Sequence, residues 1–277
     1  MSDMFEAQRR AKGSLGLGAL DIIQGFKEFY LWSNLAIEDL RSSYHRTYFG
    51  YLWFILIYLI QIGIFILIFA PVRGIDTHTT NYPAYLSFGF LIWMFITSGI
   101  TTGARVFINA RGWILSANVP YSLFLFRNCL RDAIPLLINL VVILTLAFFI
   151  WDMQPLSVLI SLATLPVFFI NFFWVGLLLG TICVRFRDIE QLVSVAMRVI
   201  FFLTPIIWTY DPDGAGFRNQ IAIYNPLTHF IELFRRPMLG EWPTELSLLV
   251  VAVVTVVGSI TGFLVFALNR RRIPFWL

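Results

Sequence analysis

Charged residues are scarce in this chain of 277 residues. They make up 13% of the sequence, whereas hydrophobic residues make up 58%, and a soluble domain carries roughly 25% charged residues. A soluble fold would need more charge to cover its surface, so we infer that lipid surrounds most of this molecule. The formal net charge is +4 and the two lysines are Lys12 and Lys27. A nucleic-acid groove needs a denser basic surface, so we expect no nucleic-acid partner.

Motifs that hold nucleotides or metals are also missing from the sequence. It contains no GxxxxGK[ST] phosphate-binding loop, so we expect any ATP and magnesium to be bound by another chain. Cys129 and Cys183 lack the CxxC spacing of a metal site or disulfide framework, and the three histidines are scattered. We therefore predict no catalytic residue, no metal site and no cofactor within this chain.

Long apolar runs dominate what is present. A membrane-spanning helix needs about 20 largely apolar residues, and six segments qualify: 51–70, ended by Pro71; 84–108; about 132–150; 157–183; about 192–210, with a kink expected at Pro205; and 246–268. The sequence thus predicts an all-α integral membrane protein with six transmembrane helices in a transmembrane domain, 50–268. A cytoplasmic segment, 1–49, precedes that domain and a basic tail, 269–277, follows it.

The basic residues predict the orientation of these helices. Sixteen of the 20 fall in residues 1–50, 105–131, 184–198 and 269–277, which the six spans place on one side of the membrane. Because cytoplasmic loops carry the excess of arginine and lysine, we expect both termini to be cytoplasmic. The central thirds of the spans carry essentially no charge, whereas a proton-coupled transporter needs titratable groups there. Energy for transport is therefore expected from a partner. The lack of an evident internal repeat also argues against an inverted-repeat transporter.

Two segments outside the spans have helical patterns of their own. Residues 20–40 are predicted to form one amphipathic helix at the headgroup boundary, with a stripe made of Ile22, Phe26, Phe29, Ala36 and Leu40. Packing of this helix against a soluble partner is the alternative. Residues 211–245 contain a short apolar run between two breaks, which favours a re-entrant hairpin on the outer side. Asn225 is expected to cap its helix and Pro226 to occupy the first turn; a loop lying flat on the bilayer is the alternative.

The first span carries an aromatic stripe. Its members are spaced three or four residues apart and therefore share one helical face: Tyr51, Phe54, Tyr58, Gln61, Phe65 and Phe69. Sugar rings stack their C–H faces on aromatic rings, and an aromatic wall lets a polymer slide because no single hydrogen bond fixes its register. The stripe is a candidate saccharide path, and ordinary helix packing is the alternative.

Two short cytoplasmic loops, 109–128 and 184–191, mix charge with large apolar groups. Such segments are suited to docking into a groove on a cytoplasmic protein. The alternative for the second loop is that Arg187 and Asp188 simply close helix ends.

These segments together resemble the ABC-2 permease family, especially its exporters of O-antigen, capsule and teichoic acid. The resemblance covers nearly the whole chain in the right order. It rests on residues 46–53, where Phe49 stands in place of the family's leucine, and on 118–121, 187–189, 201–206 and 224–228; the tail 270–277 is closest to those of capsule and O-antigen exporters.

The resemblance implies a homodimer in the bacterial inner membrane, bound to two copies of an ATPase subunit. It implies a cytoplasmic entrance for a lipid-linked polysaccharide at Phe49 and Gly50. It implies periplasmic gate helices within 211–245, and there the candidate residues are Tyr224, Asn225, Pro226 and Glu232. The expected ATPase-coupling helices, at about 111–126 and 184–191, contain Arg111, Trp113, Asn118, Pro120, Tyr121, Arg185, Arg187, Asp188 and Glu190.

Two other functions compete with polysaccharide export. An ABC-2 exporter of a drug or lipid would keep the fold and change the cargo. A membrane-embedded acyl- or glycosyltransferase would need a cluster of His, Asp or Glu at a cleft. Asp211 and Asp213 are better explained by the turn they occupy.

Overall fold

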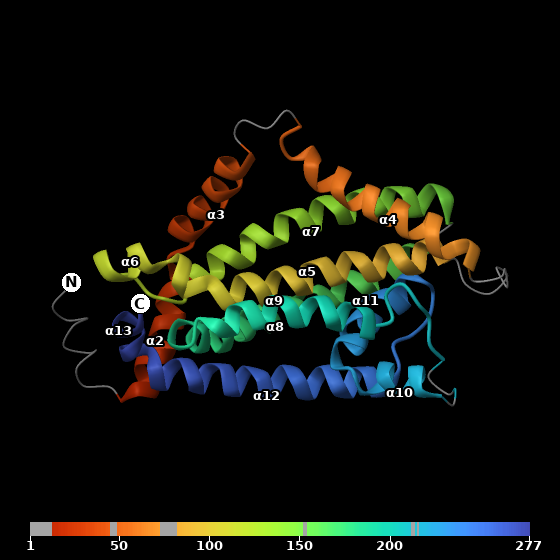
Figure 1. Cartoon of the computed structure of the whole chain (residues 1–277). Helices are drawn as coiled ribbons and strands as arrows, with labels where there is room; N and C mark the ends of the chain where they lie inside the picture. The colour runs from red at the N-terminus through yellow and green to blue at the C-terminus, as the bar shows by residue number, and fades with distance from the viewer. Residues whose placement is uncertain (1–12, 45–48, 73–81, 152–153, 212–213, 215) are drawn as a thin grey trace.

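The computed structural model describes residues 13–44, 49–72, 82–151, 154–211, 214 and 216–277, and these form helices joined by short connections (Figure 1). The side chains of residues 44 and 70–72 lie outside the description. The helices are α2 (Ser14–Lys27), α3 (Phe29–Tyr44), α4 (Leu52–Val72), α5 (Tyr82–Asn109), α6 (Arg111–Ser116), α7 (Leu123–Ile150), α8 (Pro155–Arg185), α9 (Asp188–Leu203), α10 (Phe217–Tyr224), α11 (Pro226–Met238), α12 (Glu245–Asn269), the 3₁₀ turn Arg270–Arg272 and α13 (Ile273–Trp276).

Five of the described helices are long and apolar enough to cross a membrane: α4, α5, α7, α8 and α12. They run along the length of the molecule (Figure 1). Helices α2, α6 and α13 gather at one end, which we call the α6 end, and α10 and α11 lie at the other, the α11 end. The chain is therefore a helical membrane protein that crosses the bilayer several times.

Helix α5 is the centre of the bundle. In its membrane-crossing stretch 67% of the residues are buried within the chain, against 11% in α4. Its most extensive contact is with α8, where Gly99 and Gly103 of α5 face Phe172 and Gly176 of α8, and Gly180 follows one turn further along. Pairs of small residues four apart on both helices let the backbones approach closely, as is typical of helix contacts in membranes.

Helix α9 corrects the expected fifth span, 192–210. It begins at Asp188, ends at Leu203 and has 16 residues, so its length is about 24 Å, less than the ~30 Å of a hydrocarbon core. The helix ends before Pro205 instead of kinking there, because a proline disfavours helical geometry in the residue before it. The count of six transmembrane helices therefore stays a prediction, with five helices of sufficient length among the described residues.

Two further boundaries differ from the sequence prediction. Helix α7 begins at Leu123, nine residues before Asp132, because the charges that seemed to delimit it are paired: Arg127 with Asp39, and Arg131 with Asp132. The single amphipathic helix predicted over 20–40 is two helices that meet at Glu28.

The predicted stripe on those two helices is also corrected. Phe26 and Phe29 are more than 60% exposed, which agrees with a face at the headgroup boundary, but Ala36 and Leu40 are buried inside the chain. The five residues therefore do not share one environment, and Asp21, outside the stripe, is buried as well.

Candidate functional site

The first predicted coupling segment forms α6 and the loop after it. Ile114 is buried and anchors α6, whereas Arg111, Trp113 and Leu115 on the same short helix are exposed. The anchored helix thus presents one aromatic and one aliphatic side chain outward beside a positive charge. This arrangement suits docking into a groove of another protein, where aromatic residues and arginine are enriched.

The loop after α6 borders a pocket of about 340 Å³ at the surface, lined by residues 114–119, Tyr121 and Arg270. Asn118 is exposed and Pro120 is buried. The Arg270 guanidinium lies 4.6 Å from the centre of the Tyr121 ring, a cation–π contact. The loop is thereby attached to the C-terminal end of α12.

The second predicted coupling segment is the tight turn between α8 and α9. Arg187 precedes α9, and Asp188 and Glu190 lie in its first turn, where negative charge stabilises the helix dipole. The Glu190 carboxylate accepts a 2.7 Å contact from Arg105 of α5, and Arg185 stacks on the Trp276 ring at 5.3 Å. These contacts fit the helix-end interpretation, and docking of the exposed residues stays a prediction.

A buried carboxylate joins these elements, and sequence reasoning missed it. Asp21 of α2 accepts hydrogen bonds from the backbone N–H groups of Tyr121 (3.1 Å) and Ser122 (2.8 Å). It also pairs with Arg270 at 2.6 Å. Gly25, one turn later on α2, allows its backbone to touch Ser122. Helix α2, the loop after α6 and the end of α12 are therefore held together at one carboxylate, which we call the Asp21 clamp.

We expect the Asp21→Asn substitution to destabilise the protein by on the order of 2 kcal/mol, because charge-assisted hydrogen bonds to a buried group are lost. Thermal unfolding of the purified chain in detergent measures the effect. The control is Glu38→Gln, at an exposed position of α3, which should leave the unfolding midpoint unchanged. Equal midpoints for both variants would show that the Asp21 clamp contributes nothing.

The predicted aromatic stripe lies partly inside the bundle. Tyr58 is fully buried and donates a 2.9 Å hydrogen bond to the Ser87 carbonyl. Phe65 packs against Phe90 and Phe201, and Phe69 packs against the same core. Ordinary helix packing thus accounts for these residues in this conformation.

The other stripe residues, Tyr51, Phe54 and Gln61, are exposed or half-buried. Their role in a saccharide path stays a prediction, and an alanine at Tyr58 would test packing rather than the path.

The predicted entrance residues form the turn before α4. Gly50 has a φ of +52°, a left-handed conformation that glycine adopts without strain. Phe49 is 44% exposed and meets Trp53 edge to face, with ring centres 5.4 Å apart. The turn therefore displays aromatic surface at the start of the α4 helix.

At the α11 end, the predicted helix start is confirmed. The Asn225 side chain accepts a 3.0 Å hydrogen bond from the Leu227 N–H, and Pro226 is the first residue of α11. The Asn225 amide also donates to the Thr204 hydroxyl, which follows α9, at 2.8 Å. Tyr224, which ends α10, is 84% exposed. The turn between α10 and α11 is thus fixed to the end of α9 and displays one aromatic ring.

Glu232 belongs to a buried group of charges within α11. It pairs with Arg235 and with Arg236, the latter at 2.7 Å. Arg235 is fully buried, donates 2.8 Å to the Pro205 carbonyl and stacks on the Tyr85 ring at 3.6 Å.

Two tyrosines of α5 donate hydrogen bonds to backbone carbonyls of the non-helical segment that follows α9. Tyr85 donates to the carbonyls of Pro205 and Trp208, and Tyr82 donates to that of Ile207. Nearby, burial raises the pKa of Tyr210 to about 12, an effect that the Glu232 carboxylate reinforces, so that phenol is neutral. Helices α5 and α11 therefore satisfy the backbone carbonyls together where α9 stops, through Tyr82, Tyr85 and Arg235.

The described residues contain no group of three or more His, Cys, Asp and Glu that could hold a metal ion. The α6 end carries a short helix that is anchored by Ile114 and exposes Trp113 and Leu115, and the α11 end carries the short packed helix α11.

The sequence of this chain is similar to those of known membrane proteins. The chain is 28% identical over 238 residues to the O-antigen export system permease protein RfbA of Klebsiella pneumoniae, covering 83% of this chain and 90% of the relative. It is 24% identical over 252 residues to the protein of that name from Myxococcus xanthus, covering 84% and 92%. The family described as ABC-2 type transporter matches residues 31–239, about three-quarters of the sequence, and the chain therefore belongs to that family.

Proposed function

We propose that this chain is the membrane-spanning permease of an ATP-driven exporter that moves a lipid-linked polysaccharide out of the cytoplasm. The observation that carries the proposal is the likeness to three O-antigen export permeases, each matched over at least 90% of its own length. Membership of the ABC-2 family supports transport rather than catalysis as the role of the chain. The cargo is an O-antigen, a capsule or a similar polymer on its lipid carrier.

The energy comes from a separate ATPase subunit, present in two copies. This part rests on the family and on the sequence, which contains no phosphate-binding loop of its own. Trp113 and Leu115 of α6 are the exposed apolar residues that would enter the ATPase groove. The permease itself makes and breaks no covalent bond. In this arrangement the α6 end and both termini face the cytoplasm, in the bacterial inner membrane.

The transport path requires a second copy of the chain. Helix α4 is largely uncovered, and α9 exposes an apolar row at three- and four-residue spacing made of Leu192, Val195, Val199 and Phe202. In the proposed homodimer these two helices face the partner and move apart when ATP binding drives the coupling segments. The residues of the α11 end, Glu232 among them, form the outer closure of the path.

Deletion of the gene in its host tests this function. Surface polysaccharide should disappear while the lipid-linked polymer accumulates inside, as immunoblots of whole cells and spheroplast fractions would show. Susceptibility to drugs should stay unchanged, since the cargo is a sugar polymer. Unaltered surface polymer would contradict the proposal, and changed drug resistance with normal polymer would support the drug exporter. Purified chain that transfers acyl or glycosyl groups would support the transferase.

A further inference from the structure

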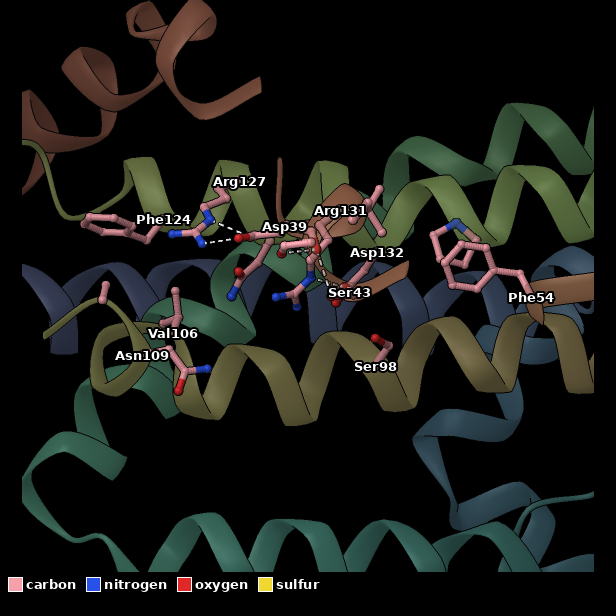
Figure 2. A pocket seen from close by; sticks show the side chains of 15 residues that line it. Asp39, Ser43, Phe54, Ser98, Val106, Asn109, Phe124, Arg127, Arg131 and Asp132 are labelled. Carbon is pink, nitrogen blue, oxygen red and sulfur yellow. Dashed lines mark hydrogen bonds and ion pairs between the residues drawn. The ribbon is translucent and has the colours of Figure 1, made fainter. Parts of the chain in front are cut away.

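A polar pocket lies between α3, α4, α5 and α7, with a volume of about 440 Å³ (Figure 2). This size falls in the range of about 300–1,000 Å³ that small-molecule sites occupy. Its polar side chains come from three helices and its aromatic rings from α4 and α7. The lining residues used below are Asp39, Phe54, Ser98, Asn109, Arg127, Asn128, Arg131 and Asp132.

The charges around the pocket are balanced in pairs. Arg127 donates through Nε and Nη2 to Asp39, the first at 2.6 Å. Arg131 donates through Nε to Asp132 at 2.9 Å, and the other Asp132 oxygen accepts from Thr102 at 2.7 Å. Each guanidinium has five N–H donors, so both retain donors beyond those used in the pairs. These ion pairs fix the orientation of both guanidinium groups and both carboxylates. The four formal charges at the pocket therefore sum to zero.

This chemistry favours a neutral polyhydroxy ligand over an anion. Hydroxyl groups donate and accept at once, and the pocket offers carboxylates, amides and guanidinium groups together. A phosphate accepts only and would add uncompensated negative charge beside Asp39 and Asp132. The Phe54 ring supplies an apolar face of the kind that stacks on the C–H side of a sugar. Phe54 is also the one stripe residue among the lining residues.

The position of the pocket agrees with a sugar on a lipid anchor. Helix α3, which contributes Asp39, exposes Phe29, Tyr30 and Ile37, an apolar and aromatic face typical of helices at the headgroup boundary. A lipid carrier keeps its chain in the hydrocarbon region, so the sugars next to it lie at headgroup depth. The pocket is at the level of that helix.

We propose that this pocket is a binding site for the sugar units of the cargo nearest its lipid anchor. The proposal rests on the proposed function and names a site for its substrate. Asp39, Asn109, Asn128 and Arg131 bind hydroxyl groups and Phe54 stacks on a ring. The site therefore selects the anchored end of the polymer before it enters the path.

Protection of an engineered thiol tests the binding. Ser98→Cys places a thiol in the pocket of a chain whose own cysteines are replaced by Cys129→Ser and Cys183→Ala, held in lipid nanodiscs. The host polysaccharide, released from its carrier by mild acid, should slow modification by a water-soluble maleimide by about tenfold, as expected for a site mostly occupied by ligand. Inorganic pyrophosphate should not. A thiol at Ser116→Cys on α6 is the control and should react at an unchanged rate.

Two pocket variants show whether protection depends on these residues. Asn109→Ala, at an exposed position, and Arg131→Gln should each weaken the affinity for the glycan by about tenfold, the usual loss for one hydrogen bond involving a charged or amide group. At the same glycan concentration, protection should fall from about tenfold to about twofold. Arg271→Gln in the exposed tail should leave protection intact. Protection by pyrophosphate but not by the glycan, or no protection at all, would overturn the proposal. So would full protection in both variants.

Export assays separate this proposal from the proposed function. If deletion of the gene leaves surface polysaccharide intact, the proposed function fails. If deletion abolishes export but Asn109→Ala and Arg131→Gln export normally and remain protected, the pocket proposal alone fails. Both variants should lower export while the yield of folded protein on gel filtration stays that of the parent.

Discussion

The Gly103→Val substitution is expected to abolish the folded protein. A Cβ atom at this position would lie 3.0 Å from the Cα of Gly176 and 3.3 Å from its nitrogen, and backbone atoms cannot move aside as a side chain can. Two further methyl carbons would force α5 and α8 apart along the most extensive contact in the bundle. Overpacking alone costs about 1–3 kcal/mol and occasionally more, and here the loss of close helix contacts is added.

Gel filtration of a fluorescent fusion measures this effect as the yield of monodisperse protein. The matched control is Gly63→Ala in α4, where a Cβ would meet nothing within 4 Å. Because alanine favours a helix over glycine by up to about 1 kcal/mol, Gly63→Ala should keep or raise the yield. A normal yield of Gly103→Val would mean that α5 and α8 do not touch through these glycines.

Most of the long helices could be predicted from the sequence because the thickness of the bilayer sets the length of an apolar span. The predicted segments 84–108 and 246–268 agree with α5 and α12 to within two residues at each end. The start of α11 was also predictable, since an Asn–Pro pair has a local physical reason to cap a helix. Both features depend on neighbours in the sequence.

The features that the sequence did not predict involve residues whose partners lie far away in the chain. Nothing near Asp21 in the sequence indicates that its carboxylate is buried, because its partners are Tyr121, Ser122 and Arg270, at least a hundred residues later. The start of α7 was misplaced for the same reason, because Arg127 is neutralised by Asp39 from another helix. A hydropathy pattern counts charges and does not show whether they are paired.

The aromatic stripe shows a second limit. Its spacing placed Tyr58 and Phe65 correctly on one face of α4. The same spacing is expected whether that face packs inside the chain or lines a transport path. Tyr58 faces Ser87 of the same chain, and no local pattern distinguishes that neighbour from a second copy. The polar pocket lay in no single motif, since its lining comes from four helices. The sequence feature that points to this pocket is the pair Arg127 and Arg131, four residues apart on α7.

The buried charges of α11 yield the second large prediction. Glu232→Leu should destabilise the protein by about 3–5 kcal/mol, because it leaves a buried arginine without its carboxylate. Arg235 is fully buried, and its Nε atom has no hydrogen-bond partner among the described residues. A control is Glu241→Leu, which removes an exposed carboxylate 3.6 Å from Arg236. Exposed pairs contribute about 0–1 kcal/mol, so that variant should unfold at nearly the parental temperature.

Removing the arginine should cost less than removing the carboxylate. In Arg235→Met the Glu232 carboxylate keeps Arg236 at 2.7 Å, and the Pro205 carbonyl keeps its hydrogen bond from Tyr85. The double variant Glu232→Leu with Arg235→Met should therefore be more stable than Glu232→Leu alone, since no fully buried charge remains unpaired. Thermal unfolding of the four proteins in one detergent completes the cycle. Additive losses would show that the two charges do not interact, and that α11 is held at this end by its apolar contacts alone.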